Sequence, residues 1–230
     1  MEHLALKEES VLKLVRVWFR KEGTAKYISH LDLNRCISRA FHKAKIPLWY
    51  TQGFNPHPFL TFALPLSLGI SGIRESMDIK MEQEFSKDDF MLRLNDALPA
   101  GIKIFDVTDP IMKPGKIAYA LYSIWLEPQN GIISPEAKQK IEELFGSENI
   151  IVPKRSKSGI KDINLIPYLD KTTVSEQENK ILIRSILPAG STENINPSLL
   201  IDAINKYLSY SFFVTIVRED IYDDQLCPFC

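Results

Sequence analysis

Residues 27–70 read YISHLDLNRCISRAFHKAKIPLWYTQGFNPHPFLTFALPLSLGI, and this stretch decides the fold of the first half of the chain. Ser29, followed three residues later by Asp32, has the form of a capping box and predicts the start of a helix. Apolar residues then recur at helical spacing until Pro47 stops the helix. The residues predicted to face the core are Leu33, Ile37, Ala40, Phe41 and Ala44.

The helix is followed by a stiff turn, Gly-Phe-Asn-Pro-His-Pro, at residues 53–58. Gly53 permits a positive φ, and each proline restricts the residue before it, so Asn55 and His57 are held extended. Such a loop presents the Phe54 ring, the Asn55 amide and the His57 imidazole at fixed positions to a nucleotide or a peptide. The alternative is a purely structural turn that fixes the register of the flanking strands.

Extended segments and a second helix surround this region. Residues 11–20 are predicted to form a strand with Val15, Val17 and Phe19 on its core face. The other predicted elements are strands at residues 47–52, 59–66, 75–82 and 102–108 and a helix capped by Ser86 and Asp89. The first half therefore has the order βαββαβ, with one additional extended segment.

The pattern restarts after residues 109–116, DPIMKPGK, whose two prolines and glycine are typical of a joint between domains. The second half predicts a strand, a helix, two extended stretches separated by a polar region, a helix and a closing strand. Their predicted positions are 117–127, 134–145, 149–155, 180–188, 196–208 and 212–220. We therefore predict an α+β fold of tandem ferredoxin-like (split βαβ) units with antiparallel sheets, in domains at 1–110 and 116–230.

The formal net charge is −1, which excludes a polycation that coats nucleic acid indiscriminately. The charges are unevenly distributed, because residues 11–60 carry many lysines and arginines against only Glu22 and Asp32. A second basic cluster lies in a Ser- and Gly-containing stretch that is typical of a hairpin tip. Its members are Lys154, Arg155, Lys157 and Lys161.

A ferredoxin-like unit packs both helices on one side of its sheet, so the other side is the expected place for a ligand. On the first strand this face carries Arg16, Trp18 and Arg20. The ring would stack on a base and the guanidinium groups would bind phosphates, as in single-stranded RNA recognition. The alternative is that Trp18 packs against the other domain and the arginines pair with carboxylates.

The outer face of the first helix is a second candidate surface. Arg35, Arg39, His42 and Lys43 lie there at spacings of three and four residues and can follow a phosphate backbone. Lys26 belongs to the same basic segment. The alternative is an ordinary solvated helix face.

Histidine and cysteine give weaker signals. His30 lies at the start of the helix, where the positive end of the dipole disfavours its charged form. Cys227 and Cys230 have C-x-x-C spacing, which is half of a tetrahedral zinc site or a redox pair, and the alternative is a frayed tail. Because the sequence has no second C-x-x-C, we expect no metal and no cofactor.

The sequence predicts a cytoplasmic protein without a membrane segment. Its apolar stretches are shorter than the roughly 20 residues that a membrane span requires. The first residues, MEHLALKEESVLK, lack the apolar core of a signal peptide. Three cysteines are an odd number and argue against a disulfide framework.

Several words of this sequence, in this order, resemble a known family. Y-I-S-H-L-D-L, Y-T-Q-G-F-N-P-H-P, F-A-L-P-L-S-L-G and M-D-I-K, within residues 15–81, are similar to the radical-SAM-linked domain family of unknown function. Its members occur alone or fused behind a cobalamin-binding radical SAM protein, so the resemblance implies a radical SAM/cobalamin partner and no established reaction. The matching positions are Ser29, His30, Asp32, Gly53, Phe54, Asn55, Pro56 and Asp78.

The chain is not expected to be the radical SAM enzyme itself, because it lacks three closely spaced cysteines for an iron–sulfur cluster. We predict a non-catalytic recognition module that binds RNA, or an RNA-containing substrate, for a separate radical SAM enzyme. The predicted nucleic-acid-binding residues are Arg16, Trp18, Arg20, Lys26, Arg35, Arg39, Lys43, Phe54, Asn55, His57, Lys154, Arg155, Lys157 and Lys161.

Two alternatives stay open. One is a metal-independent RNA-processing nuclease, in which His30 or His57 would act beside Tyr27 or a lysine. The other is a domain that only docks on a protein partner.

Overall fold

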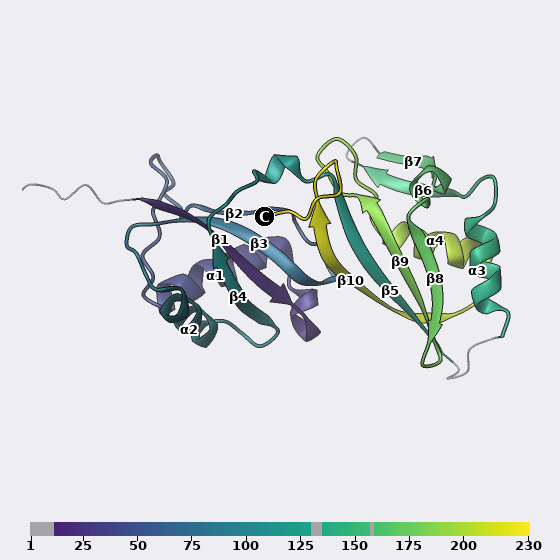
Figure 1. The fold of residues 1–230 in the computed structure, drawn as a ribbon, viewed down its shortest axis with the longest axis horizontal. Coiled ribbons are helices and arrows are strands. Elements are labelled where there is room, and N and C mark those ends of the chain that lie inside the picture. The colour runs from purple at the N-terminus through teal and green to yellow at the C-terminus, as the bar shows by residue number, and fades with distance from the viewer. Residues whose placement is uncertain (1–11, 130–134, 157–158) are drawn as a thin grey trace, which may run out of the picture. The chain divides into compact units, whose positions relative to one another are not determined.

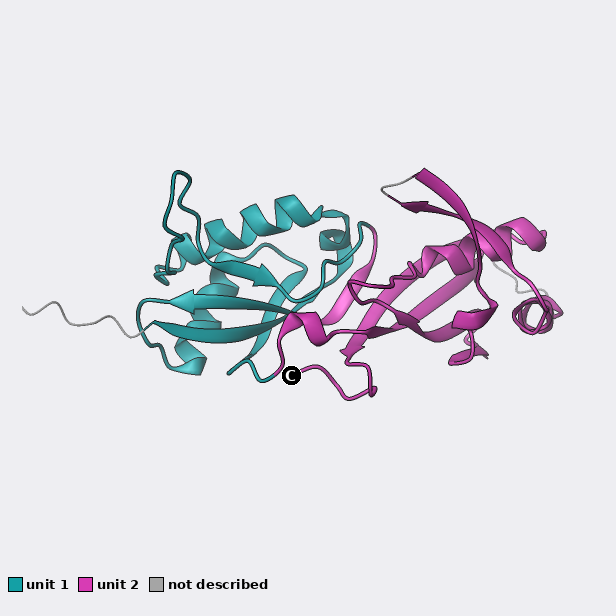
Figure 2. Cartoon of the chain, turned by 90° about the horizontal axis from the view of Figure 1, so that it is seen from above, with its two compact units in different colours: residues 1–68, 75–111 teal, residues 69–74, 112–230 magenta. Residues whose placement is uncertain are grey.

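A computed structural model describes residues 12–129, 135–156 and 159–230. The chain divides into two compact units (Figure 2). Unit 1 comprises residues 1–68 and 75–111, and unit 2 comprises residues 69–74 and 112–230. The chain thus passes from unit 1 to unit 2 within the Pro- and Gly-containing segment 109–116. Unit 2 also takes residues 69–74, a contribution that no local sequence feature indicates.

Unit 1 has the element order β-α-β-β-α-β (Figure 1). Its elements are β1 (Lys13–Lys21), α1 (His30–Lys43), β2 (Leu60–Phe62), β3 (Ser71–Met81), α2 (Lys87–Ala97) and β4 (Ile102–Thr108). The strand order is β4-β1-β3, with β2 paired to β3. This is the element order of a split βαβ unit, and it agrees with the order that the sequence predicts.

Both helices of unit 1 begin at the predicted caps. The Ser29 hydroxyl accepts a hydrogen bond from the Asp32 amide at 3.2 Å, and the Ser86 hydroxyl accepts one from the Asp89 amide at 3.2 Å. At its other end α1 stops at Lys43, because Lys45 adopts a left-handed conformation with φ 56°. The helix therefore ends before Pro47, which the sequence analysis assigned as its stop.

The core of unit 1 lies between the two helices and one face of the sheet. The predicted inward residues of β1 and α1 are all buried in it, which confirms the period-2 and helical assignments. They are Val15, Val17, Phe19, Leu33, Ile37, Ala40, Phe41 and Ala44. α2 adds Phe90 and Leu94 to the same cluster.

Unit 2 repeats this arrangement with an inserted hairpin. Its sheet has the order β10-β5-β9-β8, and β6 and β7 form a separate two-stranded sheet. The elements are β5 (Tyr119–Pro128), α3 (Ala137–Phe145), β6 (Ile151–Ser156), β7 (Gly159–Asn164), β8 (Thr172–Gln177), β9 (Lys180–Pro188), α4 (Ser198–Tyr207) and β10 (Phe212–Tyr222). The predicted α+β class with mostly antiparallel strands is thus confirmed.

The sequence analysis missed two strands of unit 2. The polar region between the predicted stretches 149–155 and 180–188 contains both β7 and β8. β8 is an edge strand of sequence TTVSEQ, and edge strands carry too few apolar residues to show a clear alternation. As a result, the predicted stretch 149–155 forms part of the hairpin and does not pair with β9. The strand that pairs with β9 at this edge is β8. Ser134, predicted to cap α3, lies outside the described residues.

Strand β3 also differs from its prediction, since it begins at Ser71 and not at residue 75. Its first residues belong to unit 2, where Ser71 and Gly72 pair with Val217 and Arg218 of β10. The predicted strand at 47–52 is reduced to single bridges at Leu48 and Tyr50. None of the helices in the described ranges is long and apolar enough to cross a membrane.

Candidate nucleic-acid interface

The β6–β7 hairpin of unit 2 carries the second basic cluster. The two strands pair antiparallel, with Lys154 directly opposite Lys161 and Arg155 opposite Ile160. The hairpin predicted from the sequence is therefore present, while Lys157 lies outside the described residues. Two like charges opposite each other on a strand pair are destabilising. The pair Lys154–Lys161 therefore suggests that these lysines serve binding and not the stability of the hairpin.

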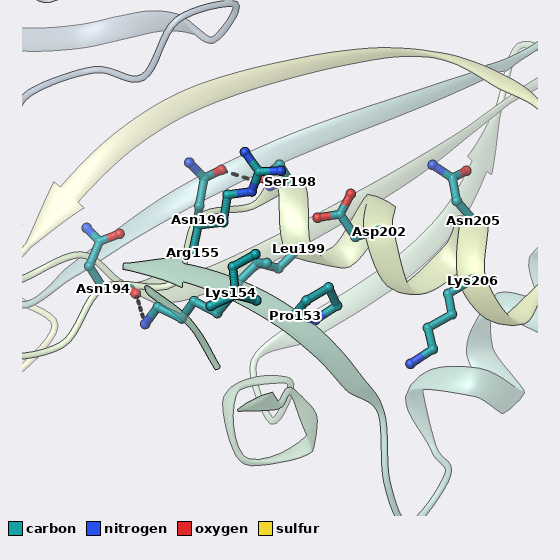
Figure 3. Close-up of a pocket in the computed structure, with 11 residues that line it drawn as sticks. Pro153, Lys154, Arg155, Asn194, Asn196, Ser198, Leu199, Asp202, Asn205 and Lys206 are labelled. Atoms are coloured by element: carbon teal, nitrogen blue, oxygen red, sulfur yellow. Dashed lines mark hydrogen bonds between the residues drawn. The ribbon is translucent and has the colours of Figure 1, made fainter. Parts of the chain in front are cut away.

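The hairpin lies against α4, and the space between them is a cleft of about 670 Å³ (Figure 3). Lys154, Arg155 and Lys206 line it with positive charge, and Asp202 is the one carboxylate among its described lining residues. Three amides, Asn194, Asn196 and Asn205, complete the polar lining. We call this surface, together with Lys161, the hairpin cleft.

Several hydrogen bonds fix the walls of the hairpin cleft. Lys154 donates from Nζ to the Asn194 carbonyl at 2.7 Å, and Lys206 donates to the Ile151 carbonyl at 2.9 Å. Asn196 accepts from the Ser198 amide at 3.0 Å, at the first turn of α4. Figure 3 shows Arg155 beside Asn196 and Ser198 at one end of the cleft and Lys206 at the other end.

Asp202 is a carboxylate in the hairpin cleft, but the described part of the chain forms no ion pair with the cations there. Within the described ranges, none of its four cations has a carboxylate at ion-pair distance. Uncompensated lysine and arginine side chains on a concave surface attract anions. Amides beside them offer donors and acceptors to sugars and bases. The arrangement is therefore suited to a phosphate backbone.

The expectation that Arg16 and Trp18 of β1 face water is wrong. Arg16 is fully buried and forms a two-pronged ion pair with Asp78 of β3, with Nε–Oδ1 at 2.7 Å and Nη2–Oδ2 at 2.9 Å. Trp18 is 3% exposed, and its indole N–H donates to the Thr108 hydroxyl at 2.9 Å. β1 is thus buried on both faces. Burial of the polar groups of Arg16 and Trp18 is tolerated because each has a hydrogen-bond partner. These two residues are not available to a ligand.

Arg20, the third residue of this predicted set, is exposed at the end of β1. Its guanidinium lies 5.7 Å from the centre of the Phe105 ring. Lys26 similarly lies 5.2 Å from the ring of Tyr27, whose side chain is exposed. Each of these cations is thus near an exposed aromatic ring, a pairing that leaves both groups accessible.

The outer face of α1 is exposed, as both interpretations of its basic residues require. Arg35 and Asp32 form an exposed ion pair at 3.2 Å, and Arg39 is exposed. Lys43 lies at the end of the helix and borders a cavity of about 750 Å³ that also includes Tyr50. This cavity joins the end of α1 to the base of the loop that carries Phe54.

The loop at residues 53–58 is ordered by hydrogen bonds of His57. Its Nδ1 lies 3.1 Å from the Asn55 carbonyl and 3.1 Å from the Thr51 hydroxyl, so the ring joins two points of the loop. The His57 amide donates to the Thr51 hydroxyl at 3.2 Å. Gly53 has φ 141°, a conformation that favours glycine, and Phe54 is fully exposed at the tip. The loop therefore presents the Phe54 ring as predicted.

His30 lies in a half-buried position against the Phe62 ring, with centroids 5.1 Å apart. Burial, and to a lesser extent the charge of Lys21, lowers the pKa of His30, which favours the neutral form. Lys21 is itself buried and donates to the Ile28 carbonyl at 2.8 Å. Lys21, whose charge lowers the pKa of His30, thus donates to a backbone carbonyl and does not line an open groove.

Several residues that match the sequence motifs of the resembled family have structural partners. Asp78 binds Arg16, and Ser29 donates to the Asp32 carboxylate at 2.7 Å, the main cause of the lowered pKa of Asp32. Pro56 is exposed in the loop between Asn55 and His57. These sequence motifs therefore form a helix cap, a buried ion pair and a turn.

The chain terminus with Cys227 and Cys230 is held in place. Phe229 between them is fully buried, its amide donates to the Ile221 carbonyl at 2.9 Å, and the Cys230 carbonyl accepts from Met112 at 2.7 Å. The frayed tail that we considered as an alternative is thus wrong. Over the described residues, no group of three or more His, Cys, Asp and Glu side chains gathers in the manner of a metal site.

Sequence reasoning missed the α4 side of the hairpin cleft. Ser198, Asp202, Asn205 and Lys206 follow helical spacing, so a polar stripe was visible in the sequence. Nothing local indicated that this stripe would lie opposite β6, because the two elements are about 50 residues apart. The predicted nucleic-acid-binding residues of unit 1 lie on β1, on α1, in the turn Gly23–Tyr27 and in the loop at 53–58. Of these, Lys43 lines the described cavity at that loop's base.

The family described as "Uncharacterized protein conserved in bacteria (DUF2344)" matches residues 14–197. The match includes the whole of unit 1 from β1 onward and unit 2 as far as the start of α4. No curated protein matches the chain.

Proposed function

We propose that this chain, which belongs to the uncharacterized bacterial family DUF2344, is a non-catalytic recognition module that binds RNA for a separate enzyme. The observation that carries the proposal is the hairpin cleft, where Lys154, Arg155 and Lys206 line a hollow and Lys161 lies opposite Lys154 on the hairpin, with no paired carboxylate among the described residues. Clustered cations of this kind provide the electrostatic part of RNA binding.

The geometry favours a polymer over a small anion. Lys161 and Arg155 lie on the exposed hairpin, and Lys206 lies two turns along α4 from Ser198. Figure 3 shows Arg155 and Lys206 at opposite ends of the cleft, so the charges are not focused on one point. A chain of phosphates contacts such a row of cations one after another, whereas a single phosphate contacts few of them.

The exposed face of α1 in unit 1 extends the proposal. Arg35, Arg39 and Lys43 form a row on one helix side, and Phe54 offers an aromatic ring. Stacking on exposed rings and contact with cations are the two terms that single-stranded RNA binding combines.

The enzyme that the module serves is proposed to be a radical SAM protein with cobalamin, acting in the cytoplasm. The support for this partner is the resemblance carried by the words S-H-L-D-L and G-F-N-P-H-P. Copurification of the two proteins at moderate salt would support the association, and separate elution would count against it.

A salt titration tests the RNA proposal. The Arg155→Gln/Lys161→Gln double variant should bind a single-stranded RNA more weakly than the wild type. Each lost phosphate contact lowers the slope of log K against log salt by about 0.7, so the slope should fall by about 1.4. The measurement is filter binding of a labelled oligonucleotide across a salt series.

The matched control is Lys138→Gln/Lys140→Gln on α3, which removes two lysines from exposed ion pairs of the same unit. This control should leave the slope unchanged. Absence of RNA retention by the wild type at low salt would contradict the proposal, as would equal slopes for both double variants. Cleavage of the RNA in EDTA would instead favour the nuclease alternative.

A further inference from the structure

In the described part of the chain, one face of the unit 2 sheet carries no helix (Figure 1). Along β5, Ile124 and Leu126 are fully buried and pair with Ile183 and Ile181 of β9, which are also fully buried. This is the face that α4 covers, on the far side of the strands in Figure 1. The alternate residues of β5 point to the opposite, helix-free face. Trp125 is among them, and it is half-buried.

A second aromatic residue lies beside Trp125 on this face. Thr215 of β10 pairs directly with Trp125, and Phe213 pairs with Glu127, so Phe213 is the diagonal neighbour of Trp125. Diagonal residues on one face lie about 7–8 Å apart, which is within reach of aromatic side chains. The Phe213 side chain is 63% exposed, which is unusual for a phenylalanine in a strand.

The space at these two rings is a hollow of about 470 Å³. Its polar rim consists of Glu127, Gln177, Glu178 and Lys180, and Thr215, directly opposite Trp125, also lines it. Glu127 and Lys180 form an ion pair at 2.9 Å, so their charges largely offset each other. The volume is within the range of small-ligand sites, which combine apolar walls with a few polar groups.

The neighbouring part of the same face is closed to ligands. Ser123 donates to one carboxylate oxygen of Glu219, and Arg184 donates to the other at 2.7 Å. Leu182, the cross-strand partner of Trp125 on the other side, is buried. The accessible part of the face is therefore confined to the two aromatic rings and their polar rim.

We infer that this hollow is a nucleobase site, in which a base of single-stranded RNA stacks on Trp125 and Phe213. Aromatic side chains on the helix-free face of a four-stranded sheet bind bases in this way in RNA-recognition domains. Gln177, Thr215 and Glu127 supply donors and acceptors for the edge of the base. The inference deepens the proposed RNA function, on which it rests, by assigning base contacts to a surface separate from the hairpin cleft.

A phosphate is a poor occupant of the same hollow. Its rim contains two carboxylates, Glu127 and Glu178, against one cation, Lys180. The site therefore repels anions, whereas an uncharged flat ring meets no electrostatic repulsion there. Stacking also does not require a particular base, because every base has an aromatic face.

The decisive comparison is between single-stranded and double-stranded RNA. Trp125→Ala and Phe213→Ala should each weaken binding of a single-stranded oligonucleotide by about 5- to 150-fold, the equivalent of 1–3 kcal/mol per stacked base. Binding of a duplex of the same length should not change, because its bases are already stacked and inaccessible. Leu92→Ala, on α2 of unit 1 and equally exposed at 63%, is the matched control and should change neither affinity.

The outcomes separate this inference from the proposed function. If both aromatic variants bind single-stranded RNA as the wild type does, while Arg155→Gln/Lys161→Gln weakens binding, the base site is overturned and the RNA function stands. If the wild type binds no RNA, the RNA function fails and the base site is tested alone by adenosine. Adenosine should then quench tryptophan fluorescence saturably in the wild type and not in Trp125→Phe, and equal behaviour of the two proteins would overturn the site.

Discussion

The first strands of the two units, β1 and β5, carry equivalent tryptophans in different surroundings. Each strand turns its aliphatic residues to the helices, and Trp18 and Trp125 lie on the opposite face. Trp18 is buried and bonded to Thr108, whereas Trp125 lines an accessible hollow with Phe213. The same alternation thus produces a structural residue in one unit and a candidate binding residue in the other.

The difference teaches that a period-2 pattern identifies two faces and does not say whether the second is covered. In unit 1 the second face contains the ion pair of Arg16 and Asp78, both buried. In unit 2 the second face is covered only in part, since Ser123 is buried whereas Glu127 is exposed and Lys180 is half-buried. The charge of a residue therefore did not reveal its exposure, since Arg16 is buried in unit 1 and Glu127 is exposed in unit 2.

The sharpest test of this comparison is truncation of the two tryptophans. Trp18→Ala should lower the free energy of unfolding by about 3–5 kcal/mol, because it leaves a large cavity and removes a partner of Thr108. Trp125→Ala should cost only about 1–2 kcal/mol, since the ring is half-buried. Urea denaturation followed by circular dichroism measures both. Equal costs for the two variants would remove the distinction between the strands.

Removing one partner of the buried ion pair should have the next largest effect. Asp78→Ala leaves the Arg16 guanidinium charged and buried, so a loss of about 3 kcal/mol or more is expected. Glu142→Ala is the control, because it breaks an exposed pair with Lys138 and should cost about 0.3–0.5 kcal/mol. The two variants are compared by the same denaturation experiment. A cost for Asp78→Ala as small as that of the control would show that Arg16 is solvated.

The surfaces of the two units can be compared by RNA affinity. Arg35→Gln/Arg39→Gln on α1 should weaken single-stranded RNA binding roughly threefold to tenfold at low salt through lost phosphate contacts. The loss should be smaller than that of the hairpin variant, because Asp32 already neutralises part of the charge of Arg35. Filter binding with both double variants measures the order. A larger loss for the α1 variant would move the main RNA surface to unit 1.

The smallest expected effect is the pH dependence that His30 adds to unit 1. The pKa of His30 is lowered from its ordinary value of 6.5, so the unfolded chain binds more protons than the folded one just below that pH. The stability contributed by neutral His30 is therefore present above pH 6.5 and is lost as the pH falls. Thermal denaturation of wild type and His30→Gln between neutral and mildly acidic pH measures it. The wild type should lose stability faster on acidification, and parallel curves would contradict the assignment.

Much of the fold follows from local sequence. Ser29 and Ser86 cap the predicted helices, and Val15, Val17 and Phe19 are buried as the alternation requires. The exceptions are β8 and the start of β3, whose formation depends on pairing with β9 and with β10. Edge strands and strand extensions take their stability from a partner strand, so their own residues need not be apolar.

The candidate site was predictable only in part. The basic residues of the hairpin were visible as a cluster, and so was the stiff turn that exposes Phe54. The opposite wall of the hairpin cleft, from α4, and the pairing of Trp125 with Phe213 were not visible. Both bring together residues about 40 to 90 positions apart, as the separation of their elements shows.

The sequence by itself determined the helix caps, the α+β order of the elements and the two basic clusters, because each depends on neighbours within a few residues. Tertiary structure alone decided which polar residues face water. Arg16 is buried because Asp78 of another strand offers two oxygens at hydrogen-bonding distance, and Lys161 is exposed because the described structure places no such carboxylate beside it. The cost of burying a charge depends on its partner, and the partner is fixed only when distant strands meet.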